Sequence, residues 1–443
     1  MSLRFPTAVL SFLLLAVFFA PLAAAQSVPM SEEEILASAD ARIERHRKAD
    51  VTIRIVDGEN RPIEGATVEL RQTNHRFLFG SNIFKWGKFD DQKEEKIYRD
   101  RFSELLNFAT LPYYWWSYEG EQDKPSHENR EAIARWCKAN DIETKGHPLA
   151  WNYAQPRWLA GKDTEQVMKL QTGRTEDCVR RFRGLVDVWD VVNEATHYGR
   201  SECRRRAPDL SATIDAFGRD AFIRKNFEAA RRANPAATLL INDYRTDEEY
   251  YKILDGLQDE QGKPIFDVVG IQSHMHGGTW STSHLWDRCE KYAKFGLPIH
   301  FTEMTVVSGT KGHYGSDPQD WPSTEEGEKR QAEEVTRIYT ILFSHPAVEA
   351  ITWWDFADRH AWRGAPAGLI GEDLSPKPAY LALKRLIKGK WWTEQSLKTD
   401  AAGKASTRGF MGTYQLTITT GNKKKTVNVE LVPGENIFDV VLD

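Results

Sequence analysis

The sequence predicts an α/β fold, a (β/α)8 barrel flanked at both ends by short β segments. Three observations predict it: eight short apolar runs follow one another, segments of helical periodicity separate them, and the two flanking segments alternate apolar with polar residues. Eight strand–helix units over about 300 residues are typical of such a barrel. A doubly wound sheet is the alternative, but no G-x-G-x-x-G pattern follows any of the runs.

Length and charge limit the classes of protein that this chain can be. It has 443 residues, 41% of them hydrophobic, and a formal net charge of −5. This balance is that of a globular protein with one large domain and a small one. It offers no basic stripe, so we expect no nucleic-acid partner. The four cysteines (Cys137, Cys178, Cys203 and Cys289) rule out a disulfide scaffold, and their spacing does not decide between pairing and free, buried thiols.

The first segment, residues 1–25, reads as a signal peptide. Arg4 supplies a positive charge, residues 8–20 form an apolar run, and residues 22–25 are the small residues of a cleavage site. We therefore expect a secreted or periplasmic protein without stable membrane insertion after cleavage. An uncleaved N-terminal anchor is the alternative.

The segment 26–76 is predicted to hold a short helix and a β-hairpin. Ser31 and Glu34 have the spacing of a capping box, and Val51, Ile53 and Ile55 alternate with polar residues. The C-terminal segment 391–443 alternates in the same way. Because an isolated hairpin is marginally stable in water, we expect the two ends to pack together as one small β-sandwich with the barrel inserted between them. Two independent extensions lying against the barrel are the alternative.

The barrel is predicted to span residues 77–390. Helical periodicity between the strands is clearest from Val335 to Phe343, where apolar residues recur at i, i+3, i+4, i+7 and i+8. The eight predicted strand regions are Phe77–Phe84, Leu106–Tyr114, Glu143–Trp151, Val188–Glu194, Thr238–Tyr244, Val268–His274, Ile299–Met304 and Ala350–Phe356.

Two glutamates stand at the ends of predicted strands, where a barrel carries its reacting groups. Asn193 and Glu194 end the fourth strand, and Glu303 lies near the end of the seventh. On one rim the two would face each other as acid/base and nucleophile, about 5–5.5 Å apart, the arrangement that gives retention in glycoside hydrolysis. We expect the like charge of Glu303 to raise the pKa of Glu194. A strand-end glutamate that only caps the next turn is the alternative for Glu194.

The sixth strand ends in an H-x-H pair, His274 and His276. His274 is expected to hydrogen-bond Glu303 and help keep it ionised. A metal-dependent hydrolase is the alternative, but His147 is the only other obvious histidine at a strand end, and a metal site needs further ligands. We therefore predict neither a metal nor a cofactor.

Several motifs, in order, resemble glycoside hydrolase family 10, the family of endo-1,4-β-xylanases. The resemblance covers about residues 77–387. It rests on G-H-P-L-A-W at 146–151, W-D-V-V-N-E at 189–194, N-D-Y at 242–244, G-I-Q-S-H at 270–274, the T-E pair at 302–303, Trp354, Asp358 and Trp362, and K-P-A-Y at 377–380.

The resemblance implies that Glu194 is the proton donor and Glu303 the nucleophile of a retaining hydrolase that cleaves β-1,4 bonds in xylan. It implies a polysaccharide as the partner. Flat tryptophan faces suit the apolar side of a sugar ring, and amides and imidazoles suit its hydroxyls. The residues expected to bind substrate are His147, Trp151, Asn193, Tyr244, Gln272, His274, Trp354 and Trp362.

Two departures from the family pattern affect the expected substrate. The family carries T-x-E-N-x-x-K after the second strand, where this chain reads T-L-P-Y-Y-W-W at 110–116, and Asn152 replaces a second histidine. Tyr113, Trp115 and Trp116 would either stack on a sugar or fill an unused subsite. Hydrolysis of another β-linked glycan or β-glycoside, and an inactive carbohydrate-binding barrel, therefore stay as alternatives.

Overall fold

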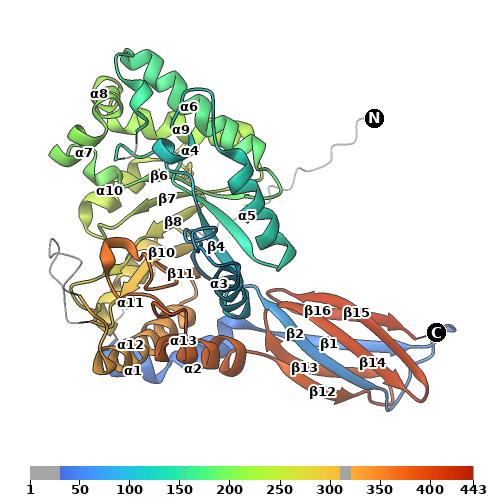
Figure 1. The fold of residues 1–443 in the computed structure, drawn as a ribbon. Helices are drawn as coiled ribbons and strands as arrows, with labels where there is room; N and C mark the ends of the chain where they lie inside the picture. Colours follow the sequence, from blue (N-terminus) through green and yellow to red (C-terminus); the bar gives the residue numbers. More distant parts are fainter. Residues whose placement is uncertain (1–29, 154, 310–320, 443) are drawn as a thin grey trace, which may run out of the picture.

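The computed structural model describes residues 30–153, 155–309 and 321–442. The predicted signal peptide lies outside these residues. Within them, no helix combines the length and the apolar character needed to cross a membrane. The chain forms a barrel with a β-sandwich at its side (Figure 1).

Eight parallel strands close into the predicted barrel. Each strand pairs with the next, and the last, β11, pairs with both β10 and the first, β3, which closes the ring. Each of the eight predicted runs overlaps one of these strands, so the predicted barrel is confirmed. The strands are β3 (Leu78–Asn82), β4 (Phe108–Pro112), β5 (Glu143–His147), β6 (Val188–Asn193), β7 (Thr238–Asp243), β8 (Val268–Ile271), β10 (Ile299–Val306) and β11 (Val348–Trp353), with β9 (His274–Met275) as a short addition beside β10.

Helices surround the barrel and bury their apolar stripes against it. In α12 (Glu325–Ser344), the predicted periodic residues Val335, Ile338 and Leu342 are buried. The others on the barrel are α3 (Gln92–Leu105), α4 (Trp115–Tyr118), α5 (His127–Ala139), α6 (Thr164–Arg181), α7 (Ser201–Arg206), α8 (Pro208–Phe217), α9 (Arg219–Ala233), α10 (Glu248–Gly256), α11 (Thr282–Ala293) and α13 (Pro378–Arg385). Short turns are η1 (Arg157–Leu159), η2 (Ala195–His197), η4 (Trp362–Gly364) and the π-helical η5 (Leu386–Lys390).

Two N-terminal helices, α1 (Glu32–Ala37) and α2 (Ala39–Arg47), precede the first strand and lie beside α11 and α12. The predicted capping box is present, because the Ser31 side chain accepts from the Glu34 amide and Glu34 accepts from the Ser31 amide. Glu32 also accepts from Ser283 on α11, with an N–O distance of 3.0 Å. These contacts fix the chain before it enters the sandwich.

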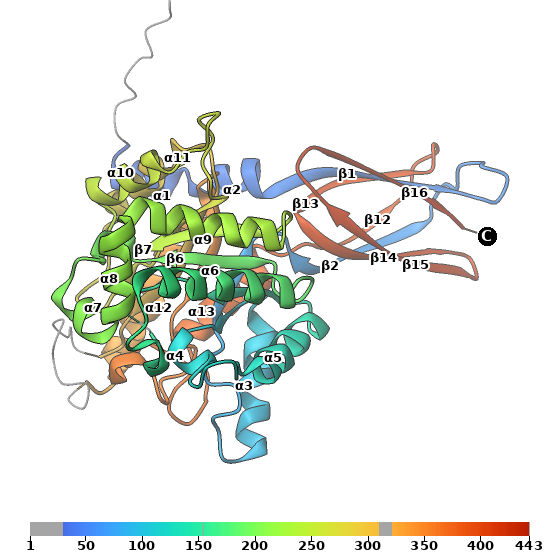
Figure 2. The same cartoon turned by 90° about the horizontal axis from the view of Figure 1, so that it is seen from above.

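Both ends of the chain build one β-sandwich, as the fold-class prediction expects. One sheet has the order β13–β1–β16 and the other β12–β2–β14–β15. Val68 of β2 pairs with Leu397 of β12 and Ile418 of β14, so the reading of two independent extensions is wrong. Figure 2 shows the blue N-terminal strands lying among the red C-terminal ones. The strands are β1 (Lys48–Val56), β2 (Thr67–His75), β12 (Glu394–Lys398), β13 (Lys404–Phe410), β14 (Gly412–Thr420), β15 (Lys423–Leu431) and β16 (Glu435–Val441).

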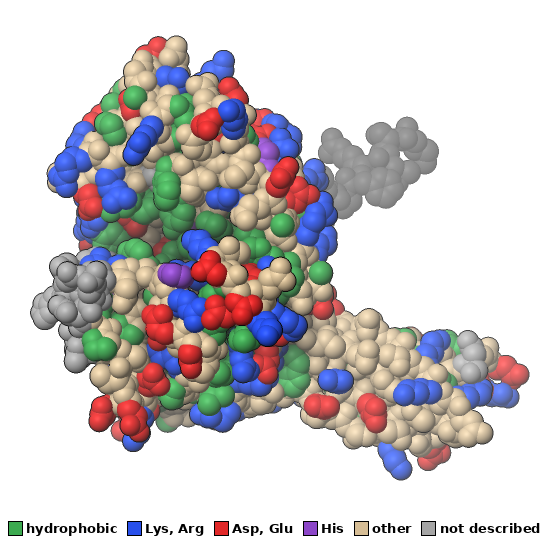
Figure 3. Space-filling model, in the orientation of Figure 1, with side chains coloured by type: hydrophobic (Ala, Val, Ile, Leu, Met, Phe, Trp, Pro, Cys, Tyr) green, Lys and Arg blue, Asp and Glu red, His purple; other side chains and the backbone are tan. Residues whose placement is uncertain are grey.

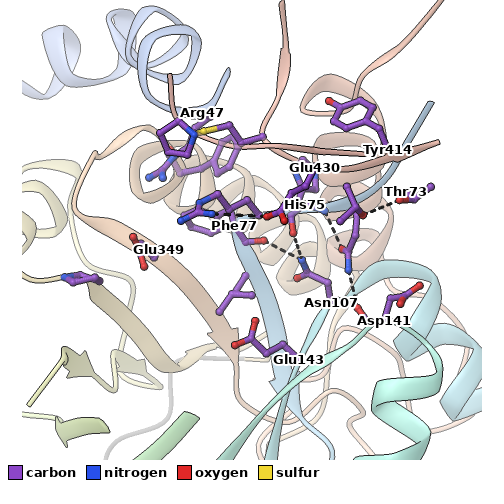
Figure 4. Close-up of a pocket in the computed structure, with 18 of the residues that line it drawn as sticks. Arg47, Thr73, His75, Phe77, Asn107, Asp141, Glu143, Glu349, Tyr414 and Glu430 are labelled. Atoms are coloured by element: carbon purple, nitrogen blue, oxygen red, sulfur yellow. Dashed lines mark hydrogen bonds and ion pairs between the residues drawn. The ribbon is translucent and has the colours of Figure 1, made fainter. Parts of the chain in front are cut away.

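The sandwich meets the barrel at the end where the strands begin, around a cavity of about 1220 Å³ (Figure 4). The His75 ring contacts the Ile387 carbonyl at 2.9 Å, and the Asn107 amide donates to the carbonyls of His75 and Phe77. Arg47 is buried and donates to three carbonyls of the barrel chain between residues 343 and 348. The site described below lies at the opposite end of the strands.

Candidate active site

Glu194 and Glu303 stand at the C-terminal ends of β6 and β10, as predicted. Glu194 directly follows β6 in a left-handed backbone conformation, with φ of 56°. Its backbone N–H donates to the Asn242 carbonyl at 2.8 Å, and Asp243 accepts from the N–H and hydroxyl of Thr196. A non-glycine residue keeps such a conformation only where its surroundings hold it, and such residues cluster at functional sites.

One chain of amide hydrogen bonds joins the two carboxyl groups. Gln272 donates from Nε2 to Glu194 at 3.1 Å and to the Asn193 Oδ1 at 3.2 Å. Asn242 donates from Nδ2 to Glu303 at 2.8 Å and to the same Asn193 oxygen at 3.0 Å. Because its oxygen accepts both bonds, Asn193 has its NH2 group left to meet a sugar hydroxyl.

The position of Asn242 depends on a glycine, Gly270, which has no side chain. Gly270 of β8 lies against it, and a Cβ at this glycine would come within 2.7 Å of the Asn242 Oδ1 and 2.9 Å of the Ile241 carbonyl. A Cβ does not tolerate contacts that short, so any larger residue would displace the amide that bonds Glu303. The G-I-Q-S-H motif thus supports Glu303 through packing as well as through His274.

Glu194 is held as a carboxylic acid. Burial raises its pKa to about 8, and the negative charges of Asp243 and Glu303 add to the rise, while the Gln272 hydrogen bond and Arg200 oppose it. The predicted direction of the pKa shift of Glu194 is correct, but the predicted cause was incomplete. The largest cause is burial, which the sequence did not reveal, and the like charge of Glu303 is a smaller one.

Glu303 is held as a carboxylate. Its side chain is buried, and burial alone would raise its pKa, but His147, His274 and the ammonium of Lys145 outweigh that effect and lower it. The His274 Nε2 lies 3.1 Å from one oxygen of Glu303, as predicted, and the His147 Nε2 lies 3.9 Å from the other. His147 is itself oriented by Asp190, which is 2.6 Å from its Nδ1.

His147, Asp190 and Glu303 are the one group in the described residues whose ligand atoms are close enough to share a metal ion, all within 4.8 Å. The hydrogen bond between His147 and Asp190 already uses two of these atoms. The H-x-H pair, His274 and His276, on which the metal interpretation depended, does not belong to this group. The geometry therefore fits hydrogen bonding to the Glu303 carboxylate.

Three of the predicted tryptophans surround the two glutamates. The Trp151 Nε1 donates to Glu194 at 3.2 Å. Trp354 is buried, with its ring 5.5 Å from the His147 ring, whereas Trp362 is 41% exposed and lies 4.9 Å from the His274 ring. Hydrophobic side chains gather in a hollow on this side of the molecule (Figure 3). Flat rings beside polar groups suit the two faces of a sugar.

Tyr244, also predicted to bind substrate, lies on the side of Glu194. Its hydroxyl is 2.6 Å from the His197 Nε2, and the two rings stack at 4.4 Å. His197 belongs to η2, the turn that begins directly after Glu194. The structure therefore places Tyr244 beside the segment that directly follows Glu194.

The aromatic run after β4 divides into core and cleft residues. Tyr113 and Trp115 are buried, and their rings pack on Trp189 and Trp158 respectively, so the predicted stacking of these two rings on a sugar is wrong. Trp116 is 56% exposed. The residue that reaches the site is Tyr114, which the sequence reasoning did not select: its ring lies 5.5 Å from His147 and 5.9 Å from Trp151.

A buried ion pair near the site was also missed. Lys85, three residues after β3, lies 3.6 Å from Asp355, two residues after β11, and both side chains are buried. Asp355 also accepts from the Trp362 N–H at 2.8 Å, so the pair holds the loop that carries Trp362. The signal that the sequence offered for this pair was a charged residue just beyond the end of each of the two strands.

The four cysteines, Trp391 and Trp392 lie outside the site. All four cysteines are free and buried. Trp391 stacks on Phe343 with ring centroids 4.3 Å apart, and the Trp392 ring lies 5.2 Å from His75. These two tryptophans therefore belong to the junction between barrel and sandwich.

A barrel with one protonated and one ionised glutamate on its rim defines the class of glycoside hydrolases that use two carboxyl groups. The model of glycosyl hydrolase family 10 matches residues 70–386, and the chain belongs to this family. The predicted family resemblance is thereby confirmed.

Curated relatives and solved structures agree with the family. The chain is 28% identical over 406 residues to anti-sigma-I factor RsgI6 of Acetivibrio thermocellus, which covers 90% of this chain but 48% of that protein. It is 30% identical over 331 residues to endo-1,4-beta-xylanase B of Thermotoga neapolitana, covering 71% of this chain and 88% of the relative. Xylanase 10B from Thermotoga petrophila RKU-1, solved in complex with xylobiose, superposes with a TM-score of 0.58 at 27% identity, covering 71% and 95% of the two chains. The chain thus spans about half the length of the first relative and most of the other two.

Proposed function

We propose that this protein is a secreted or periplasmic retaining glycoside hydrolase that cleaves β-1,4-xylosidic bonds in xylan. The observation that carries the proposal is the pair of strand-end glutamates whose surroundings drive their pKa values in opposite directions. Double displacement needs one carboxyl group protonated and the other ionised in the free enzyme.

In the first step Glu303 attacks the anomeric carbon while Glu194 protonates the departing glycosidic oxygen. The bond between that carbon and oxygen breaks, and a glycosyl ester forms on Glu303. In the second step Glu194, now ionised, takes a proton from water, whose oxygen displaces Glu303 at the same carbon. Two inversions leave the configuration unchanged. His274 and Asn242, which both bond Glu303, stabilise its carboxylate before attack and after release.

The test is sugar release from plain xylan, glucuronoxylan, arabinoxylan and mixed-linkage glucan, with Glu303→Ala as the matched inactive variant. We expect release from the xylans by the wild type and none by the variant. NMR spectra recorded in the first minutes should show the β-anomer of the new reducing end. An α-anomer would contradict double displacement, and release from the glucan alone would contradict the xylan substrate.

Tyr114 supports a second candidate, hydrolysis of another β-linked glycan or a short β-glycoside. Its ring stands beside His147 and Trp151, on the side of the cleft where the family carries its Glu, Asn and Lys. An aromatic ring offers stacking in place of charged hydrogen bonds, and it reduces the room for a second sugar. The same panel, extended with aryl β-xyloside and β-glucoside, separates the two candidates by the chain length of the products.

A further inference from the structure

Exposed and half-buried arginines gather around the segment that follows Glu194. Four of them are already neutralised: Arg204 by Asp215, Arg206 by Glu202, Arg219 by Asp220 and Glu249, and Arg245 by Asp247. Two others, Arg200 and Arg205, are exposed and make no ion pair within the described part of the chain. They are therefore the cations of this rim that can take an anion from outside.

Only one of these two free cations lies at the site. The Arg200 guanidinium carbon is 5.0 Å from the centre of the Tyr244 ring, and the Arg200 backbone N–H donates to the His197 carbonyl at 3.0 Å. Tyr244 in turn contacts the His197 ring, in the turn that starts directly after Glu194. The charge of Arg200 is close enough to lower the pKa of Glu194, whereas Arg205 contacts none of these residues in the described structure.

An arginine held in this way is suited to bind an anion. A guanidinium that lies on an aromatic ring is held in place while its N–H edge stays free, and that edge matches a carboxylate in a bidentate geometry. Because Glu194 protonates the departing oxygen, groups beside it face the leaving-group side of the bond. In a β-linked glycan the carboxylate that can reach this side belongs to a uronic acid.

We propose that Arg200 binds the carboxylate of a uronic acid side group on the leaving-group side of the cleaved bond, so that the enzyme prefers acidic over neutral xylan. This inference rests on the proposed function and adds the substrate class to it. Tyr244 acts as the support that orients the guanidinium.

The test compares glucuronoxylan with the same polymer after its carboxyl groups have been reduced to alcohols. The measured quantity is the ratio of kcat/KM for the acidic polymer to that for the reduced one. We expect this ratio to fall about five- to tenfold in Arg200→Gln, the size of one charge-assisted hydrogen bond at a partly exposed site. Arg205→Gln is the matched control, an equally unpaired arginine nearby, and should leave the ratio unchanged.

Two results would overturn the proposal: an unchanged ratio in Arg200→Gln, or an equal fall in both variants, which would indicate only the net charge of the rim. Failure of the proposed function looks different, because the wild type would then hydrolyse neither polymer. In that case, calorimetry with acidic and reduced oligosaccharides on the Glu303→Ala protein, with and without Arg200→Gln, tests the contact without turnover. Equal affinities for the two sugars would again reject it.

Discussion

Glu194 and Glu303 stand on one rim of one barrel, and the two regions around them differ in what reaches each carboxyl group. Glu303 is contacted by two imidazoles and an amide and lies within range of a buried ammonium. Glu194 accepts from an amide and an indole N–H and has a second buried carboxylate, Asp243, nearby. The comparison teaches that burial does not decide the charge of a carboxyl group: the positive groups packed beside it do.

Removing the nucleophile should have the largest effect. Glu303→Ala should lower kcat on xylan by roughly 10⁵-fold or more, because a covalent step cannot form without the attacking oxygen. Azide should restore part of the activity on an activated aryl glycoside and yield the α-glycosyl azide, which chromatography and NMR identify. Azide rescue that gives the β-product would assign the nucleophile elsewhere.

Replacing Glu194 should lower activity less than replacing Glu303, and the size of the loss should depend on the leaving group. Glu194→Gln should cost about 10²–10⁴-fold on xylan, the usual contribution of a general acid, and far less on a dinitrophenyl glycoside that needs no proton. In the wild type, kcat/KM should fall as pH rises through about 8, since the protonated form of Glu194 is then lost. If Glu194→Gln keeps the fall of kcat/KM at alkaline pH, another group supplies the proton.

Removing the imidazole that contacts Glu303 should shift the acidic limb of the pH–rate profile. His274→Asn removes the imidazole beside the carboxylate, so the pKa of Glu303 should rise, and with it the pH at which activity appears, with a loss of about tenfold at low pH. His284→Asn is the matched control, because this histidine lies in α11 and packs on Trp280. If His274→Asn has a lower rate but its acidic limb stays at the same pH, His274 acts on substrate alone.

The smallest effect concerns stability. Because the folded-state pKa of Glu194 is raised above its ordinary value, the folded protein holds this proton more tightly than the unfolded chain does. The stability that this proton gives is therefore present at pH 4 and is lost as pH rises toward about 8. Glu194→Gln should become more stable relative to wild type between pH 5 and 9, as measured by urea midpoints. A difference that stays constant with pH would contradict the raised pKa.

The sequence could predict the strands and both glutamates because these signals are local. A buried strand that ends in a carboxyl residue can be read from neighbouring letters, and the fold then places such ends together. Side-chain direction is a weaker signal. Tyr113 and Tyr114 are adjacent and identical, yet one packs on Trp189 and the other faces His147, since successive side chains of an extended segment point in opposite directions.

Other features depend on contacts between distant segments. The pairing of Lys85 with Asp355, and the burial that raises the pKa of Glu194, arise from loops that meet only in the folded barrel. The pairing of the two chain ends was open for the same reason. Alternation predicted strands in both, but register is decided by partners that lie hundreds of residues apart.

That pairing has a consequence for the order of events at the ribosome. The strands β1 and β2 are made first, but their partners β12, β13, β14 and β16 are made last, after the whole barrel. Until then the two early strands have open edges and an uncovered apolar face, features that invite aggregation. The barrel therefore has the chance to fold before the sandwich can form, because the sandwich needs the strands from β12 to β16. A chain interrupted before β12 would carry the catalytic residues and still expose two unpaired strands.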